Sequence, residues 1–201
     1  MITIIDYGMG NLGSIANMIK KVGGRSKITS DLNEISDAEK LILPGVGSFD
    51  NGIKYLKNRG IFEVINDRVL NDKIPILGIC LGMQLMTKSS EEGVEKGLEW
   101  IDATTIRFQS DLLKVPHMGW NTINVKKESK LFDEIESEKR FYFVHSYYVT
   151  AQNDDNILTS TNYGCNFVSS FENENIIGVQ FHPEKSHKYG MNLIKNFINK
   201  Y

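Results

Sequence analysis

This sequence has few cysteines, little net charge and no long apolar segments. Only two cysteines, Cys80 and Cys165, occur among 201 residues, and such sparse use is typical of a reducing compartment, where a lone cysteine serves in catalysis or in the core. Lysine and arginine number 23 against 25 aspartates and glutamates, so no basic surface for nucleic acid or an acidic membrane is indicated. No apolar run approaches the roughly 20 residues of a membrane span, and residues 1–6 lack the features of a secretory signal. These absences predict a cytoplasmic protein without nucleic-acid or membrane partners.

What the sequence contains is an ordinary globular composition. Apolar residues make up 41% and charged residues 24% of the chain, which separates it from disordered sequences. A chain of this length buries about 70% of its unfolded surface, so its core needs neither disulfides nor a structural metal. No internal repeat or linker interrupts the sequence, which predicts a single domain over residues 1–201.

The hydrophobic pattern predicts an α/β fold. In the first half, short apolar runs alternate with segments of helical periodicity, as in an open, mostly parallel sheet with helices on both faces. The second half consists of short β-rich runs, which we interpret as an antiparallel elaboration that returns to the main sheet. The expected strands are 2–6, 25–29, 40–43, 74–79, 103–108, 122–125, 141–144, 167–171 and 176–180. The expected helices are 11–22, 52–71 with an interruption around residues 59–60, 81–88 and 189–201.

Cys80 lies where a strand should meet a helix. Gly78 and Gly82 stand two positions before and after it. A nucleophile elbow has this form because its turn is so tight that side chains at the flanking positions would clash. The helix N-terminus and a nearby imidazole would favour the thiolate. The alternative is a small cysteine buried in a glycine-containing strand, which the spacing of the two glycines disfavours.

A nucleophile of this kind needs a base and a group that orients the base. His182 follows the expected strand 176–180, and Glu184 comes two residues later, after Pro183. Glu184 could hold the imidazole in the tautomer that accepts the thiol proton. A plain polar turn is the alternative. The other histidines, His117, His145 and His187, are expected to be structural or surface residues.

Acyl chemistry at Cys80 also requires hydrogen-bond donors for an oxyanion. Gly45 and Gly47 follow the expected strand 40–43 closely, and their backbone can approach a ligand. The candidate donors are the N–H group of Leu81 and one from the Val46–Gly47 segment. An ordinary Pro-Gly turn is the alternative here.

Two other readings of these residues are weaker. A zinc deaminase site would need Pro-Cys-x-x-Cys after the His-x-Glu pair, but Cys80 precedes that pair and no Cys-x-x-Cys occurs. We therefore expect no metal.

Residues 8–13 match the Gly-x-Gly-x-x-Gly pattern, with Asp31 at the sequence separation expected of a ribose contact. The pattern is short and nothing else supports a dinucleotide, so no cofactor is expected.

Three motifs resemble those of the class I, or triad, glutamine amidotransferases. They are residues 44–47 (PGVG), 78–84 (GICLGMQ) and 181–186 (FHPEKS). The resemblance implies a flavodoxin-like fold and hydrolysis of L-glutamine to glutamate and ammonia. It also implies that Cys80 attacks the amide, that His182 carries the proton and that Glu184 orients His182. The residues that correspond to the family's glutamine-binding positions are Gly45, Gly47, Gln84, Ser146 and Tyr147.

Further segments narrow the resemblance to the glutaminase subunits of imidazole glycerol phosphate synthases. These are residues 6–12 (DYGMGNL), 115–121 (VPHMGWN) and 142–147 (YFVHSY). Such subunits form a heterodimer with a (β/α)₈-barrel cyclase of the HisF type and pass ammonia to it. The residues that match positions facing the cyclase are Asn11, Trp120, Tyr142 and Lys185.

The acceptor of the ammonia stays open at this level. Residues 178–191 and 140–148 also resemble a paralogous branch that supplies ammonia for amino or acetamidino sugars of surface polysaccharides and flagellar glycans. The triad and the glutamine chemistry are the same in both branches. Histidine biosynthesis is the expected pathway, and sugar synthesis is the alternative.

Overall fold

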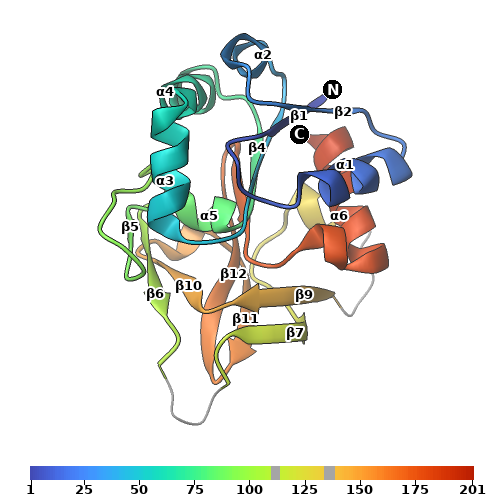
Figure 1. Cartoon of the computed structure of the whole chain (residues 1–201). Coiled ribbons are helices and arrows are strands. Elements are labelled where there is room, and N and C mark those ends of the chain that lie inside the picture. Colours follow the sequence, from blue (N-terminus) through green and yellow to red (C-terminus); the bar gives the residue numbers. More distant parts are fainter. Residues whose placement is uncertain (110–113, 134–138) are drawn as a thin grey trace.

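The computed structural model describes residues 1–109, 114–133 and 139–201. Its first half alternates strand and helix as the periodicity predicts (Figure 1). The elements are β1 Ile2–Ile5, α1 Leu12–Lys21, β2 Ser26–Thr29, α2 Leu32–Ser36, β3 Leu41–Gly45, α3 Phe49–Asn58, α4 Ile61–Asn66, the π-helical turn Asp67–Asn71, β4 Ile76–Cys80 and α5 Leu81–Leu85.

The second half is β-rich and ends in a long helix. Its strands are β5 Ser89–Ser90, β6 Ala103–Arg107, β7 His117–Thr122, β8 Asn124–Val125, β9 Arg140–His145, β10 Tyr147–Ala151, β11 Ile157–Tyr163, β12 Cys165–Asn173 and β13 Ile176–Val179. Short 3₁₀ turns occupy Lys130–Phe132, Asp154–Asn156 and Pro183–Lys185, and the helix α6 spans His187–Lys200.

The main sheet has a parallel half and an antiparallel half. The strand order is β2-β1-β3-β4-β13-β12-β10-β6-β5, and all neighbours from β2 to β13 are parallel. The first five strands have the flavodoxin-like order 2-1-3-4-5. β12 and β10 then run antiparallel to their neighbours. The predicted α/β class, with its antiparallel elaboration, is therefore confirmed.

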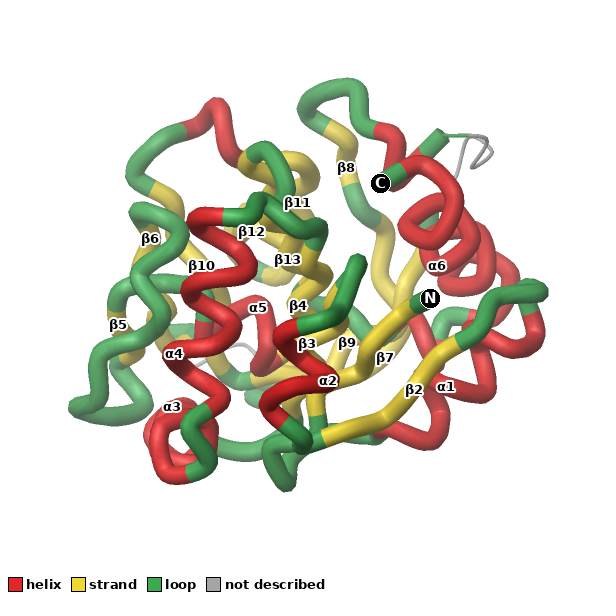
Figure 2. Tube along the Cα trace, turned by 90° about the horizontal axis from the view of Figure 1, so that it is seen from above, coloured by secondary structure: helices red, strands yellow, loops and turns green. Residues whose placement is uncertain are grey.

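Helices cover both faces of the parallel half, because alternate residues of each strand point to opposite sides. Figure 2 shows α1 and α6 on one side of these strands and α2, α3 and α4 on the other. On β3, Ile42 packs in the cluster that holds α1 and α6, whereas Leu41 and Leu43 pack with α3 and α4. The parallel strands β1, β3, β4 and β13 are buried throughout, as a sheet covered on both faces requires, whereas the edge strand β2 is partly exposed.

Several sequence-based boundaries are wrong. The strand predicted to stop before Pro44 continues to Gly45. Proline has no N–H for a ladder bond, and it is tolerated here because β1 pairs only with Leu41 and Ile42 and not with Pro44. The helix predicted to reach residue 88 ends at Leu85, since the N–H groups of Leu98 and Trp100 bond the carbonyls of Leu85 and Met86. The strand expected at 122–125 is divided between β7 and β8.

Candidate active site

Cys80 occupies a strained turn between β4 and α5. Its φ is 55° and its ψ is −107°, in the left-handed half of backbone space that non-glycine residues rarely adopt. A Cβ atom on Gly82 would lie 1.9 Å from the carbonyl oxygen of Leu43, and one on Gly78 would lie 2.8 Å from the carbonyl oxygen of Gly82. The flanking glycines are therefore required by close backbone contacts, as the elbow spacing predicts.

His182 and Glu184 are paired beside this turn. β13 runs parallel to β4, so the chain leaves both strands at the same edge of the sheet. The Nδ1 atom of His182 lies 2.7 Å from the Oε1 atom of Glu184, and both side chains are 3% exposed. The backbone N–H of His182 donates to the carbonyl of Tyr142 at 2.9 Å. The imidazole is thus held at the backbone and at Nδ1.

The Nε2 atom of His182 is free for proton transfer. It is buried and has no hydrogen-bond partner among the described residues. Burial lowers the pKa of His182, but the contacts with Cys80 and Glu184 outweigh burial and raise the pKa to about 10. The Cys80 sulfur makes a long 4.0 Å contact with the carbonyl oxygen of Val144, and no hydrogen bond joins it to the imidazole. Such contacts are often long in a ligand-free site and shorten when substrate binds.

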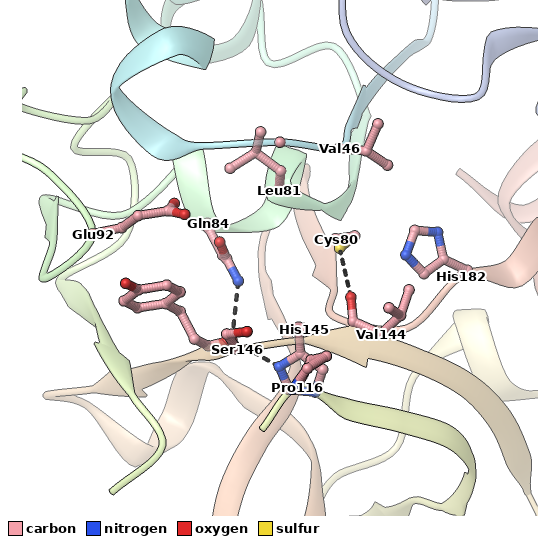
Figure 3. A pocket seen from close by; sticks show the side chains of 12 residues that line it. Val46, Cys80, Leu81, Gln84, Glu92, Pro116, Val144, His145, Ser146 and His182 are labelled. Carbon is pink, nitrogen blue, oxygen red and sulfur yellow. Dashed lines mark hydrogen bonds between the residues drawn. The ribbon is translucent and has the colours of Figure 1, made fainter. Parts of the chain in front are cut away.

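A cavity of about 360 Å³ opens over Cys80. Figure 3 shows the side chains of Cys80, Gln84 and His182 at its wall, with Val144 of β9 and Ser146 facing them. Ser146 lies where the chain leaves β9 of the small β7–β9 sheet and enters β10 of the main sheet. The lining residues are Val46, Gly47, Cys80, Leu81, Gln84, Glu92, Pro116, Val144, His145, Ser146, Tyr147 and His182.

Most of the site residues predicted from the sequence meet at this cavity. Around one cavity the structure brings Cys80 and His182 together with the predicted oxyanion segments and most of the predicted glutamine-binding residues. Glu184 lies behind His182 and contacts it directly. Gly45 is outside the lining, and a Cβ there would lie 2.7 Å from the Tyr7 hydroxyl, which itself donates to the carbonyl of Pro44. A glutamine contact at Gly45 stays a prediction.

Comparison with known proteins assigns the family. Residues 3–201 match the family model "Glutamine amidotransferase class-I". This chain belongs to the class I glutamine amidotransferases. It is therefore an enzyme with glutaminase activity.

Relatives of this amidotransferase resemble it over their whole length. It is 55% identical to "Imidazole glycerol phosphate synthase subunit HisH 2" of Methanococcus maripaludis, with all of both chains aligned. It is 48% identical to the protein of the same name from Pseudomonas aeruginosa, over 98% of each chain. Among solved structures, "Structure of PurLQS from Thermotoga maritima" has a TM-score of 0.75, 16% identity and coverage of 98% of this chain and 97% of that one. The last comparison supports the fold alone.

The described part of the amidotransferase lacks two features. None of its helices combines the length and the apolar character needed to cross a membrane. Within the same residues, no group of three or more His, Cys, Asp or Glu side chains is arranged to hold a metal ion.

Most of the residues matched to the partner-facing positions of the amidotransferase family meet on one surface. The Trp120 and Tyr142 rings lie 6.3 Å apart at their centroids, and the Nζ atom of Lys185 lies 5.7 Å from the Tyr142 ring. His187, expected only to be structural or on the surface, stacks on Trp120 at 5.5 Å. Asn11 stands just before α1 and makes no side-chain capping bond there.

Two further histidines of the amidotransferase form a directed chain. The Asn121 amide nitrogen lies 3.2 Å from Nε2 of His117, the Nδ1 atom of His117 lies 2.9 Å from Nε2 of His145, and Nδ1 of His145 lies 2.7 Å from the carbonyl oxygen of Tyr147. The amide orientation of Asn121 is set by the N–H of Thr122, which donates to its oxygen. Because an amide nitrogen only donates and a carbonyl only accepts, both rings are neutral, with the proton on Nδ1.

Burial explains the neutral state of this pair. It lowers the pKa of His117 to about 4. It is also the main cause that lowers the pKa of His145 to about 3, although the bond to the Tyr147 carbonyl acts in the opposite direction. The structural role predicted for the two histidines is therefore to hold the Tyr147 carbonyl in place, with His145 bonded to it and His117 bonded to His145.

Sequence reasoning missed two polar residues of the site. Glu92 lines the cavity from the loop after β5, and its Oε2 atom accepts from the N–H of Phe49 at 2.8 Å. Gln180 lies behind Cys80 and is fully buried. A polar residue at the end of an apolar strand, two positions before His182, was the available signal for Gln180. Nothing in the local sequence pointed to Glu92, which tertiary folding brings to the cavity.

Proposed function

We propose that this chain is the glutaminase subunit of an imidazole glycerol phosphate synthase. It hydrolyses L-glutamine to glutamate and ammonia, and the ammonia passes to a cyclase subunit that forms imidazole glycerol phosphate and AICAR in histidine biosynthesis. The proposal rests chiefly on one observation, the elbow cysteine and the His182–Glu184 pair at a single cavity. The names of the relatives support the pathway. We further infer that residues 1–201 form one domain in the cytoplasm.

In the first half of the reaction, Cys80 becomes acylated. The thiol proton moves to Nε2 of His182, whose raised pKa favours the charged ring, and the sulfur attacks the side-chain amide carbon of glutamine. The N–H of Leu81 and one from the Val46–Gly47 segment stabilise the oxyanion. The carbon–nitrogen bond then breaks, His182 gives its proton to the leaving nitrogen, and ammonia departs from a γ-glutamyl thioester.

In the second half, water releases glutamate. Nε2 of His182 takes a proton from the attacking water, and the same N–H groups stabilise the second oxyanion. Breakage of the carbon–sulfur bond returns the sulfur and its proton to Cys80. Glu184 accepts from Nδ1 of His182 throughout, which fixes the ring and stabilises its charged form.

The polar groups of the cavity suit the two charged groups that glutamine carries on its α-carbon. Both Nε2 hydrogens of Gln84 are used, for the Tyr147 carbonyl at 3.1 Å and for Gln180 at 2.9 Å. Gln84 therefore offers its oxygen to a ligand, and with the Glu92 carboxylate it suits the α-ammonium group. Ser146, between β9 and β10, and Tyr147, at the start of β10, line the same cavity and are the candidates for holding the α-carboxylate.

The surface around Trp120 is the proposed face for the cyclase. Trp120 is 39% exposed, and its neighbours Tyr142 and Lys185 add an aromatic ring and a cation, residue types that anchor interfaces. Asn11 completes the predicted set at the start of α1. A heterodimer formed on this face would enclose the ammonia between the two subunits.

Glutamine hydrolysis by the purified chain, alone and with the cyclase of the same organism and its nucleotide substrate, tests the proposal. We expect strong stimulation by the partner, and loss of hydrolysis in Cys80→Ala and Cys80→Ser while the complex still forms. Hydrolysis that survives in Cys80→Ala would overturn the chemistry.

Absence of stimulation, with a cyclase that is active on free ammonia, would overturn the pathway assignment alone. The acceptor would then be sought among amino and acetamidino sugar precursors of surface glycans. The glutaminase chemistry at Cys80 would be unaffected by that result.

A further inference from the structure

Gln180 is a buried amide that the proposed mechanism leaves unused. Its side chain is fully buried at the end of β13, and its backbone N–H donates to the carbonyl of Ser169 at 2.9 Å. The side-chain amide lies between two residues of the site. Its Oε1 atom accepts from Nε2 of Gln84 at 2.9 Å, and its Nε2 atom donates to the Cys80 sulfur at 3.6 Å.

The direction of these bonds follows from one backbone group. The carbonyl of Tyr147 can only accept, so the amide of Gln84 must turn its nitrogen toward it. The second hydrogen on that nitrogen then points to Gln180, which must receive it with Oε1. The amide nitrogen of Gln180 is left facing the sulfur. The Tyr147 carbonyl is itself held by the N–H of His145, so the chain is anchored at its far end.

We propose that Gln180 is a positioning residue that directs an N–H group at the sulfur of Cys80. This inference rests on the proposed role of Cys80 as the nucleophile. A buried donor aimed at the sulfur stabilises the thiolate relative to the thiol, because hydrogen bonds to a charged acceptor are stronger than those to a neutral one. The bond also fixes the direction of the sulfur, which the positive φ of Cys80 alone does not do.

A packing role for Gln180 predicts something different. In that case the residue would fill space and satisfy the N–H of Gln84, and its loss would lower stability without changing the reactivity of the sulfur. Gln180→Met keeps a similar volume and removes the donor. Gln180→Glu keeps an acceptor for Gln84 and places an acidic group against the sulfur, which disfavours the thiolate.

The test measures alkylation of Cys80 by iodoacetamide between pH 5 and pH 9, on the full chain carrying Cys165→Ser. The chain has two cysteines, so Cys80 is then the only thiol and no partner protein is needed. We expect Gln180→Met to slow the reaction about tenfold near pH 7. The rates should converge at high pH, where the thiolate forms without help. Gln180→Glu should slow alkylation at least as much.

A matched control separates reactivity from stability. Asn196 is a buried amide on α6 that donates to the carbonyls of Leu131 and Asp133. Asn196→Leu should lower the melting temperature and leave alkylation of Cys80 unchanged. Superimposed pH profiles of Gln180→Met and the parent would overturn the positioning role, as would faster alkylation in Gln180→Glu. Neither result affects the proposed function, which is tested by glutamine hydrolysis in Cys80→Ala.

Discussion

Close backbone contacts around the strained turn at Cys80 leave no room for a side chain at position 78 or 82. Gly82 faces the carbonyl of Leu43, and Gly78 faces Gly82 across the turn. A nucleophile on a rigid turn loses little freedom when it reacts, since folding has already fixed its position. The spacing of the glycines predicted this turn. It did not predict Gln180, because the contact joins residues 100 positions apart.

A pair of glycine substitutions tests the space at the elbow. Gly82→Ala should lower the free energy of unfolding by about 3 kcal/mol or more, because its methyl group would overlap the Leu43 carbonyl. Gly13→Ala is the control. Gly13 lies in α1, and beyond its chain neighbours and its own helix backbone no atom lies within 4 Å of an added Cβ, so this change should raise the free energy of unfolding by about 0.5–1 kcal/mol. Urea unfolding measures both, and an unchanged midpoint in Gly82→Ala would contradict the argument.

At the level of elements, the small β7–β9 sheet connects two regions of the molecule. β7 places Trp120 on the surface and His117 inside, because neighbouring positions of a strand alternate between faces. β9 ends at His145, and the next residue already lines the cavity. The sequence pattern missed β7, β10 and β11 because their alternation of polar and apolar residues is irregular. Asp31, the candidate ribose contact, instead caps α2.

The neutral histidine pair gives stability a specific pH dependence. Below pH 6.5 the unfolded chain protonates His117 and His145, whereas the native chain resists this down to about pH 4 and pH 3. The free energy of unfolding should therefore fall as the pH falls through this range, by up to about 1.4 kcal/mol per pH unit for each histidine. His182, with its pKa raised to about 10, is protonated in both states there and adds nothing to this slope.

His117→Phe isolates the contribution of one ring. The ring of His117 stacks on Phe143 and Tyr163, so phenylalanine suits the space. We expect a flatter pH dependence between pH 6 and pH 4.5, and lower stability at pH 7.5 by about 1–3 kcal/mol because Nε2 of His145 loses its partner. Urea unfolding at several pH values measures the difference. If the free energy of unfolding depended on pH equally in the variant and the wild type, His117 would not be a source of the pH dependence.

At the scale of the whole molecule, the cavity lies where several chain segments end together. β3, β4 and β13 are parallel neighbours, and the residues that follow them supply Val46, Leu81 and His182. Ligands of open α/β sheets bind at this carboxyl edge because the connecting loops diverge there. The proposed partner face of Trp120, Tyr142 and Lys185 adjoins the same edge through β9 and the turn after His182.

A pair of aromatic substitutions tests the proposed partner face. Trp120→Ala should weaken binding of the cyclase about tenfold or more, since large aromatic side chains dominate interface energies. Tyr55 is the control. It is 44% exposed on α3, in the other helical layer, so Tyr55→Ala should leave the affinity unchanged. Calorimetric titration of each variant with the cyclase measures both. Equal loss in the two variants, or none in Trp120→Ala, would move the interface elsewhere.

The sequence by itself determined the fold class, the family and the residues with reactive side chains. These depend on local signals: apolar periodicity for the alternating strands and helices, and fixed spacing around Cys80 and His182. Tertiary structure alone decided which polar groups surround them. Glu92 and His145 line the cavity, Gln180 contacts Cys80 and His117 contacts His145, and all four come from loops and strands distant from Cys80 along the chain. Their places depend on sheet order and on which face of a strand each side chain occupies, and no local pattern records either.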